Sequence, residues 1–198
     1  MEQNVFEQLA KRYDSEERIE LANVIVKEVK SELPNSKSKS LLDYGSGTGL
    51  VSLELIDLVD SIVLVDSSKQ MTDVAQAKIN NRGINNAKAV YSDFTKETPA
   101  LKADVILISL VLLHIPDTKK ILQQLFQVLN SGGKLIIVDF DKTEKISHPK
   151  VHNGFTHEEL KNHLNEVGFK STQINTFHHG TRIFMNQDAS MFVSSSMK

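Results

Sequence analysis

Three alternate glycines stand in one short segment, Leu41 to Leu50 (Leu-Leu-Asp-Tyr-Gly-Ser-Gly-Thr-Gly-Leu). The segment follows an apolar run typical of a strand and precedes a stretch expected to be helical. Glycine at such a turn lets the backbone approach a ligand where a Cβ would collide. The free amides at the start of a helix would attract a carboxylate or a phosphate. A ligand-binding turn is therefore favoured over a plain turn, because three glycines carry a large entropic cost.

The spacing of two carboxylates around this turn narrows the class of ligand. Asp43 lies two residues before Gly45, where a carboxylate would repel a pyrophosphate but pair with an ammonium group. Leu50 stands where the dinucleotide pattern G-x-G-x-x-G requires its last glycine. Asp66 ends the next apolar run. A carboxylate at the end of such a strand can accept hydrogen bonds from ribose hydroxyls. Together these positions favour a ligand with an amino-acid end and a ribose.

These residues resemble the first two motifs of the class I S-adenosylmethionine-dependent methyltransferases, particularly of their small-molecule branch. Asp43–Gly49 matches the first motif, D-x-G-x-G-x-G, and Asp66 matches the acidic residue that ends the second strand. Ser92-Asp93-Phe94 is similar to the segment after the third strand. Residues 104–114 and 129–138 resemble the fourth-strand and fifth-strand motifs. The resemblance extends from about residue 36 to the end of the chain.

The resemblance implies S-adenosylmethionine as the cofactor. Asp43 would bind the ammonium group of its methionine part, which the backbone of Gly45–Gly49 would also contact. Asp66 would bind the ribose diol in a charge-assisted pair. The cofactor-binding residues predicted in this way are Asp43, Gly45, Ser46, Gly47, Gly49, Asp66, Ser67, Met71, Asp93, Phe94 and Ser109.

Three of these residues have a purely structural alternative. Asp93 would accept a hydrogen bond from the adenine amino group and Phe94 would contact the ring face, or the two form a loop turn and a core aromatic. Met71 would pack beside the adenosine, or it is an ordinary core residue. The sequence alone leaves both alternatives open.

The segment from Ser109 to Asp117 leaves the fourth predicted strand at the edge where open α/β sheets bind ligands. It lacks the N-P-P-Y or D-P-P-Y pattern of many nucleic-acid amino-methyltransferases, which disfavours a nitrogen of a flipped base as acceptor. His114 is the predicted proton acceptor, because imidazole titrates near neutral pH. The alternative is a histidine that caps the following helix or bonds a backbone carbonyl.

A lid over the acceptor is predicted from residues 1–33, expected to be helical, and from the long loop of residues 139–155. Its candidate residues are Phe6, Tyr13 and Phe155. Tyr13, followed by an aspartate, resembles a Tyr-Asp pair found at this place in several small-molecule methyltransferases. The alternative for Tyr13 is a surface aromatic that packs a helix against the sheet.

Along the chain, short apolar runs alternate with helical patterns. This alternation predicts an α/β fold with parallel strands. Two late runs with no helix between them predict an antiparallel pair at the sheet edge. The expected fold is a Rossmann-like, doubly wound, mostly parallel sheet of seven strands with an antiparallel edge hairpin. Strands are expected at residues 41–44, 62–65, 87–91, 105–108, 135–138, 171–177 and 190–195, and helices at 50–59, 67–82, 117–129 and 156–167.

Composition bounds the remaining possibilities. A chain of 198 residues suits a single domain, residues 1–198, with a helical lid at 1–33 and a cofactor-binding core at 36–198. The net charge of -2 makes nucleic acid an unlikely partner. The absence of Cys excludes disulfides, thiolate metal sites and a cysteine nucleophile. No metal is predicted, because Pro149 disfavours the helix that would bring His148 and His152 together.

The N-terminus lacks the apolar run of a signal peptide, and no stretch is long and apolar enough to span a membrane, so a cytoplasmic protein is expected. The leading hypothesis is methyl transfer from S-adenosylmethionine to a small acceptor. The alternatives are a catalytically silent S-adenosylmethionine-binding subunit and, less favoured, an NAD-dependent oxidoreductase. The sequence decides neither the identity of the acceptor, nor which atom is methylated, nor the oligomeric state.

Overall fold

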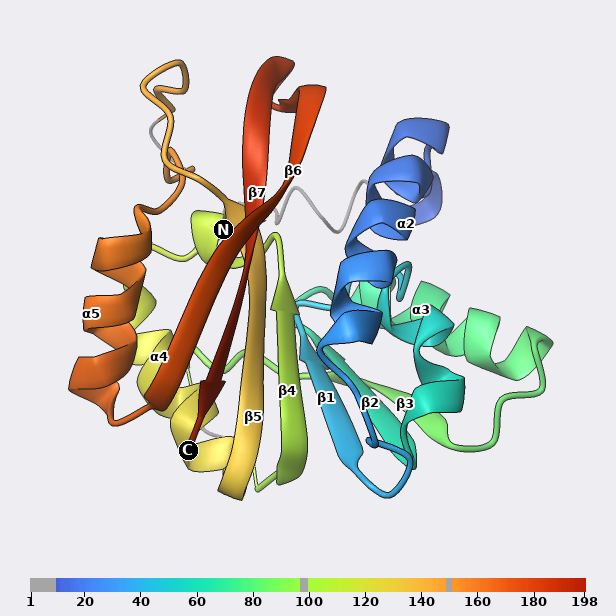
Figure 1. Ribbon diagram of the computed structural model, residues 1–198. Helices are drawn as coiled ribbons and strands as arrows, with labels where there is room; N and C mark the ends of the chain where they lie inside the picture. Colours follow the sequence, from blue (N-terminus) through green and yellow to red (C-terminus); the bar gives the residue numbers. More distant parts are fainter. Residues whose placement is uncertain (1–9, 97–99, 149–150) are drawn as a thin grey trace. The chain divides into compact units, whose positions relative to one another are not determined.

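The computed structural model describes residues 10–96, 100–148 and 151–198 (Figure 1). The chain forms two compact units, the first ending at Asp93 and the second beginning at Phe94. The seven strands follow the order β3-β2-β1-β4-β5-β7-β6 in one mixed sheet. The predicted Rossmann-like α/β fold with an antiparallel edge hairpin is therefore confirmed. Among the helices of the described residues, none is long and apolar enough to cross a membrane.

In residues 10–93, the first unit contains three parallel strands and two α-helices. β1 pairs with β2, Leu42 lying opposite Val63, and β2 pairs with β3, Leu64 lying opposite Ala89. Hydroxyl caps start both helices: Ser15 accepts from the Arg18 amide in α2, and Ser68 accepts from the Met71 amide in α3. The elements are a 3-10 helix at Ala10–Arg12, α2 at Glu16–Ser31, β1 at Ser40–Tyr44, β2 at Ser61–Asp66, α3 at Lys69–Asn81 and β3 at Ala87–Tyr91.

The prediction of one helix over residues 50–59 is wrong. The structure has two 3-10 helices there, Ser52–Glu54 and Ile56–Leu58. Val51, Ser52, Leu53 and Leu55 are all buried. No α-helix therefore begins at the glycine turn, and its amides serve other partners.

The described part of the second unit contains the other four strands of the sheet and two α-helices. The apolar face predicted for α4 is buried through Ile121, Leu122, Leu125 and Val128, which recur at helical spacing. α5 begins after the capping residue Thr156 and ends at Gly168, whose φ of 114° favours glycine. The elements are β4 at Ala103–Ser109, a 3-10 helix at Leu112–His114, α4 at Thr118–Val128, β5 at Leu129–Phe140, α5 at His157–Val167, β6 at Lys170–Phe184 and β7 at Gln187–Met197.

β4 and β5 run parallel, and the predicted edge pair is antiparallel, β7 lying between β5 and β6. Two details differ from the sequence expectations. Residues 130–133, which lie before the expected strand at 135–138, form a bulge within β5, where the partner of β4 shifts from Leu129 opposite Ala103 to Lys134 opposite Val105. The edge hairpin is longer than expected because both of its strands continue to a tight turn at Met185 and Asn186, which have positive φ.

Candidate functional site

The predicted glycine turn follows β1 directly. Gly45, Gly47 and Gly49 all have positive φ, at 74°, 55° and 79°. The amides of Gly45 and Ser46 donate to the Val65 carbonyl, at 2.8 and 3.0 Å, which fixes the start of the turn against the end of β2. Each glycine therefore occupies a conformation that other residues adopt only at a cost.

Gly49 is required for close packing as well as for its φ. A Cβ at this position would lie 2.8 Å from Leu64 Cδ2 and 3.0 Å from Leu53 Cγ. Both leucines are buried, so neither can move without disturbing the core. The last glycine of the motif is thus explained by packing within the unit, whereas a Cβ at Gly47 would have only ordinary contacts, at 3.6 Å from the Tyr13 ring.

Asp66 ties the end of β2 to the glycine turn. Its Oδ2 accepts from the Gly47 amide at 2.8 Å, and its Oδ1 accepts from the Ser68 amide at 2.8 Å. Each carboxylate oxygen has a second lone pair, so these two bonds leave acceptor capacity for a ribose hydroxyl. The structure thus brings Asp66 and the glycine turn together, as the resemblance implied.

Asp43 is a buried carboxyl beside the turn. It is 2% exposed, and its Oδ1 has no hydrogen-bond partner among the described residues. Burial raises the pKa of Asp43 from 3.8 to about 7; the Ser52 hydroxyl opposes this rise and the Asp66 carboxylate adds to it. A cation placed beside Asp43 would satisfy its oxygen and favour its charged form.

This raised pKa predicts how stability depends on pH in the absence of a ligand. The protonated form of Asp43 is favoured in the folded state, so its contribution is complete below pH 4 and is lost as pH rises from about 4 to 7. Asp43→Asn stays neutral, and we expect it to raise the free energy of unfolding at pH 7.5 by as much as about 4 kcal/mol. Urea unfolding of both proteins across this pH range measures the difference.

The same variant should bind S-adenosylmethionine more weakly than the wild type, because the amide cannot pair with an ammonium group. Asp139, the other carboxyl with a pKa raised to about 7, is present in both proteins and cancels in the comparison. Equal pH slopes for the two proteins would contradict the assigned ionisation of Asp43.

Tyr13 lies over the glycine turn. Its ring is the nearest group to a Cβ built on Gly47, and the Arg18 guanidinium lies over the ring, 4.2 Å from its centre. Burial raises the pKa of Tyr13, a rise that the Arg18 charge opposes and the Asp66 carboxylate increases. The structure therefore brings the predicted lid residue Tyr13 to the same place as Gly47 and Asp66.

The sequence missed a charged cluster that holds this part of the chain. Asp14 accepts from the Thr48 hydroxyl at 2.5 Å and pairs with Lys78 of α3 at 2.6 Å. Lys78 also donates to the Thr48 carbonyl at 2.9 Å. Asp14, the residue after Tyr13, thus connects the start of α2 to the glycine turn and to α3. The Tyr-Asp pair was the available signal, but its partner Thr48 lies far away in the sequence.

The other predicted residues of the first unit differ in accessibility. Ser46 is half-buried, and its Oγ has no hydrogen-bond partner among the described residues. Ser67 is exposed and Asp93 is half-buried, whereas Met71 is 1% exposed and belongs to the core. Phe6 falls outside the described residues.

Two predicted residues of the second unit are buried within it. Phe94 is fully buried. Phe155 is also buried and stacks on His152, with ring centres 4.6 Å apart. Its amide donates to the Phe140 carbonyl at 3.0 Å, so Phe155 anchors the loop after β5. Ser109, at the end of β4, is half-buried.

His114 ends the 3-10 helix that follows β4, and this histidine is exposed. Desolvation by the surrounding protein atoms lowers the pKa of its imidazole, and the charge of His148 lowers it further. The neutral imidazole, which can accept a proton, is therefore favoured at neutral pH.

A buried carboxyl that the sequence did not assign holds this 3-10 helix in place. Asp139 of β5 is completely buried and accepts from the Phe140 amide at 2.8 Å and the Leu113 amide at 3.3 Å. Burial raises the pKa of Asp139 to about 7, a rise that the backbone amides oppose. Asp139 therefore fixes the segment that carries His114 to the carboxyl end of β5.

Comparison with known proteins shows which family this chain matches and which relatives it resembles. Residues 35–187 match the model of a family described as a methyltransferase domain. A ubiquinone/menaquinone biosynthesis C-methyltransferase of Vibrio parahaemolyticus is 31% identical over 121 residues, 59% of this chain and 47% of its own length. The corresponding protein of Wigglesworthia glossinidia brevipalpis is 33% identical over 113 residues, 52% of this chain and 44% of its own. The chain thus spans less than half the length of these curated relatives.

Solved structures share the fold at low sequence identity. A SAM dependent methyltransferase from Aquifex aeolicus has a TM-score of 0.72 at 20% identity, over 96% of this chain and 97% of its own. Phosphoethanolamine N-methyltransferase 2 of Haemonchus contortus, solved in complex with S-adenosyl-L-methionine, has a TM-score of 0.69 at 14% identity. That alignment covers 83% of this chain and 50% of the Haemonchus chain.

Proposed function

The chain belongs to the methyltransferase domain family, and we propose that it transfers a methyl group from S-adenosylmethionine to a small-molecule acceptor. Family and fold confirm the predicted class, a class I S-adenosylmethionine-dependent methyltransferase, and S-adenosylmethionine is the cofactor that this class implies. The family match favours this class over the oxidoreductase alternative. The observation that carries the proposal is the glycine turn, with Asp66 bonded to it and beside it a buried oxygen of Asp43 that no described residue partners.

Two buried polar atoms beside the turn suit the amino-acid end of this cofactor. Asp43 Oδ1 and Ser46 Oγ have no hydrogen-bond partner among the described residues. Leaving a buried polar group unpaired costs about 1–3 kcal/mol, and an ammonium group can donate to both kinds of oxygen. The residues present therefore fit the methionine part of S-adenosylmethionine.

We assign the remaining contacts to the residues that match the family motifs. The backbone of Gly45–Gly49 contacts the methionine part, and Asp66 accepts from the ribose hydroxyls. Asp93 accepts from the adenine amino group. Ser67, Met71, Phe94 and Ser109 complete the proposed set, in which the burial of Met71 and Phe94 suits packing beneath the nucleoside rather than exposed contact.

The cofactor supplies an activated methyl group on a sulfonium with a good leaving group. The protein therefore has to hold the acceptor in line with that methyl group, and such alignment contributes roughly 7–11 kcal/mol. We propose His114 as a residue of the acceptor site and Tyr13 as a lid residue. The curated relatives named for quinone biosynthesis support a small organic acceptor.

The wild-type protein is expected to transfer labelled methyl groups from S-adenosylmethionine to a component of a low-molecular-mass cell extract. Tyr13→Phe and His114→Ala should change the Michaelis constant for that acceptor or the turnover. Scintillation counting of the extracted product measures both. If neither variant differs from the wild type, the placement of the acceptor is wrong. Cofactor binding without any transfer would instead indicate the catalytically silent subunit.

A further inference from the structure

The cluster of Asp14, Thr48 and Lys78 joins the glycine turn to the residue that follows Tyr13, within the first unit. Thr48, the residue between the last two glycines of the turn, is completely buried. Both of its oxygens are nevertheless bonded, because the hydroxyl donates to Asp14 and the carbonyl accepts from Lys78. A movement of either charged side chain therefore changes the bonds of the turn that we assign to the cofactor.

Tyr13 is held over the turn from both sides along the chain. Before it, the 3-10 helix at Ala10–Arg12 packs against α3. Its own carbonyl accepts from the Ser15 amide at 2.9 Å and from the Arg18 guanidinium at 3.1 Å. After it, Asp14 pairs with the lysine of α3 at 2.6 Å. The position of the Tyr13 ring therefore depends on this ion pair.

The ion pair can separate without disturbing the core. The side chains of Asp14 and Lys78 are 31% and 23% exposed, so water reaches both of them. A cavity of about 200 Å³ lies beside the pair and is lined by both side chains and by Gly49 and Leu50. Charged groups that remain in contact with water are hydrated when they part, which keeps the cost of separation low. The pair can therefore open and close while the unit stays folded.

The turn keeps a second attachment when this pair separates. The Gly47 amide donates to Asp66, which also accepts from the Ser68 amide at the start of α3. The first two residues of the turn are bonded to the end of β2. None of these bonds involves the ion pair. The part of the turn proposed to contact the cofactor therefore stays in place while Tyr13 moves.

We propose that Asp14 and Lys78 are positioning residues. With Thr48 they form a latch that holds Tyr13 over the glycine turn, and S-adenosylmethionine enters and leaves when this latch opens. The inference rests on the proposed function, because it takes the turn as the cofactor site. A closed latch slows entry and release alike, since the ligand passes the same tyrosine in both directions. The latch therefore acts on the rates of cofactor exchange and leaves the affinity almost unchanged.

Two variants of the latch test this proposal. Lys78→Met removes its cation, and both the association and the dissociation rate constant of S-adenosylmethionine should rise about tenfold, a barrier lowered by about 1.4 kcal/mol. Thr48→Val keeps the shape of the side chain and removes one bond, so both constants should rise about threefold. The dissociation constant should stay within threefold of the wild type. Surface plasmon resonance with the immobilised protein measures all three quantities, and thermal melts show that each variant is folded.

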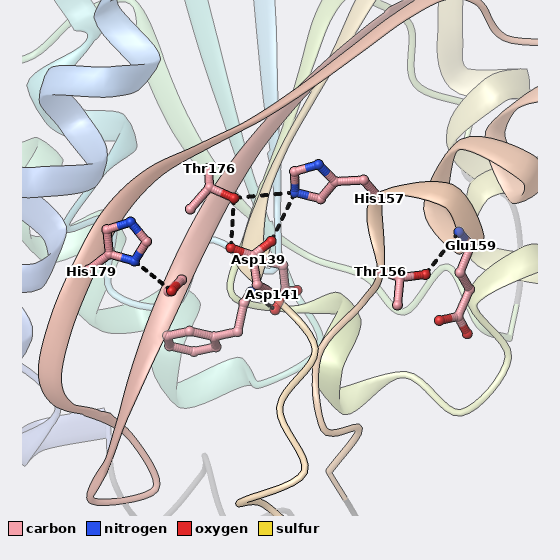
Figure 2. A network of polar contacts seen from close by, with 9 residues as sticks. Asp139, Asp141, Thr156, His157, Glu159, Thr176 and His179 are labelled. Atoms are coloured by element: carbon pink, nitrogen blue, oxygen red, sulfur yellow. Dashed lines mark hydrogen bonds and ion pairs between the residues drawn. The ribbon is translucent and has the colours of Figure 1, made fainter.

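The control for Thr48→Val is Thr176→Val in the second unit. The Thr176 hydroxyl donates to Asp141 at 2.8 Å, and the other oxygen of this carboxylate lies 2.9 Å from Nε2 of His157. Figure 2 shows the three side chains converging on the carboxylate. The change thus removes the same kind of bond, from threonine to aspartate, in a cluster with no residue assigned to the cofactor. Both rate constants should stay within twofold of the wild type.

The control for Lys78→Met is Lys69→Met, which breaks the exposed ion pair with Asp73 on the same helix and should leave both rate constants within twofold. Unchanged rate constants in Lys78→Met overturn the proposal. A weaker affinity without faster association also overturns it, because the cluster would then only brace the turn. A wild-type protein that binds no S-adenosylmethionine overturns the proposed function itself, and this inference with it. The two failures are therefore distinguishable.

A spectroscopic measurement tests the latch without any cofactor. The chain has three tyrosines, of which Tyr44 is buried and Tyr91 is exposed, so these two mark the limits of solvent access. With labelled tyrosine, a soluble gadolinium complex should relax the ring protons of Tyr13 at least twofold more in Lys78→Met than in the wild type. Lys69→Met should leave this relaxation unchanged. A cluster that only braces the turn does not require this response, and equal relaxation in Lys78→Met and the wild type overturns the proposal.

Discussion

Replacing Asp66 by alanine is expected to weaken S-adenosylmethionine binding by at least about 100-fold. The change removes the proposed acceptor for the ribose hydroxyls, and hydrogen bonds to a charged group contribute about 1.5–3 kcal/mol each. It also deprives the Gly47 and Ser68 amides of their acceptor, so the glycine turn loses its tie to the end of β2. Isothermal titration calorimetry with S-adenosylmethionine measures the loss.

A second aspartate in the same unit provides the control for that experiment. Asp73 lies on α3, where its side chain is 63% exposed and pairs with Lys69. Exposed pairs of this kind contribute about 0–1 kcal/mol, so Asp73→Ala should keep the affinity of the wild type. Wild-type affinity in Asp66→Ala would refute the proposed ribose contact and, with it, the placement of the cofactor at this turn.

Gly154→Ala is expected to destabilise the protein by about 3–4 kcal/mol. Gly154 has a φ of 96°, which costs another residue about 1–2 kcal/mol. Its added Cβ would also collide with the Asp141 carbonyl oxygen and lie 2.8 Å from the Phe140 oxygen. Both are backbone atoms that cannot rotate away, and overpacking costs a further 1–3 kcal/mol or so. The thermal midpoint should fall by roughly 10 °C.

Gly132 separates the two causes of this loss. It has a similar positive φ, 70°, but a Cβ there would meet nothing within 4 Å. Gly132→Ala should therefore show only the conformational cost, about 1–2 kcal/mol, in a thermal melt. Equal losses in both variants would mean that the loop after β5 does not pack against Phe140 and Asp141 in the way described. Because Gly154 lies against the backbone of Asp141, this packing also holds the Asp141 carboxylate in place for its hydrogen bond with His157.

The local residue pattern determined most of the architecture. Apolar runs predicted the strands, and helical periodicity predicted α3, α4 and α5. The pattern from Asp43 to Gly49 predicted a glycine turn after the first strand, and the structure has a turn there with positive φ at each glycine. These features depend on contacts within a few residues, so the sequence states them directly. The single helix expected at residues 50–59 is replaced by two 3-10 helices, a difference that the local pattern does not explain.

Only the tertiary structure decided how distant residues meet. The cluster of Asp14, Thr48 and Lys78 joins three separate segments, and no spacing in the sequence indicates it. The pKa of Asp43 and that of Asp139 are raised because the fold buries both carboxyls, which their residue type cannot reveal. Likewise, Asp141, His157 and Thr176 converge because a strand end, a helix start and an edge strand are brought side by side. Backbone conformation is set by local energies, whereas burial and charge proximity are properties of the packed chain.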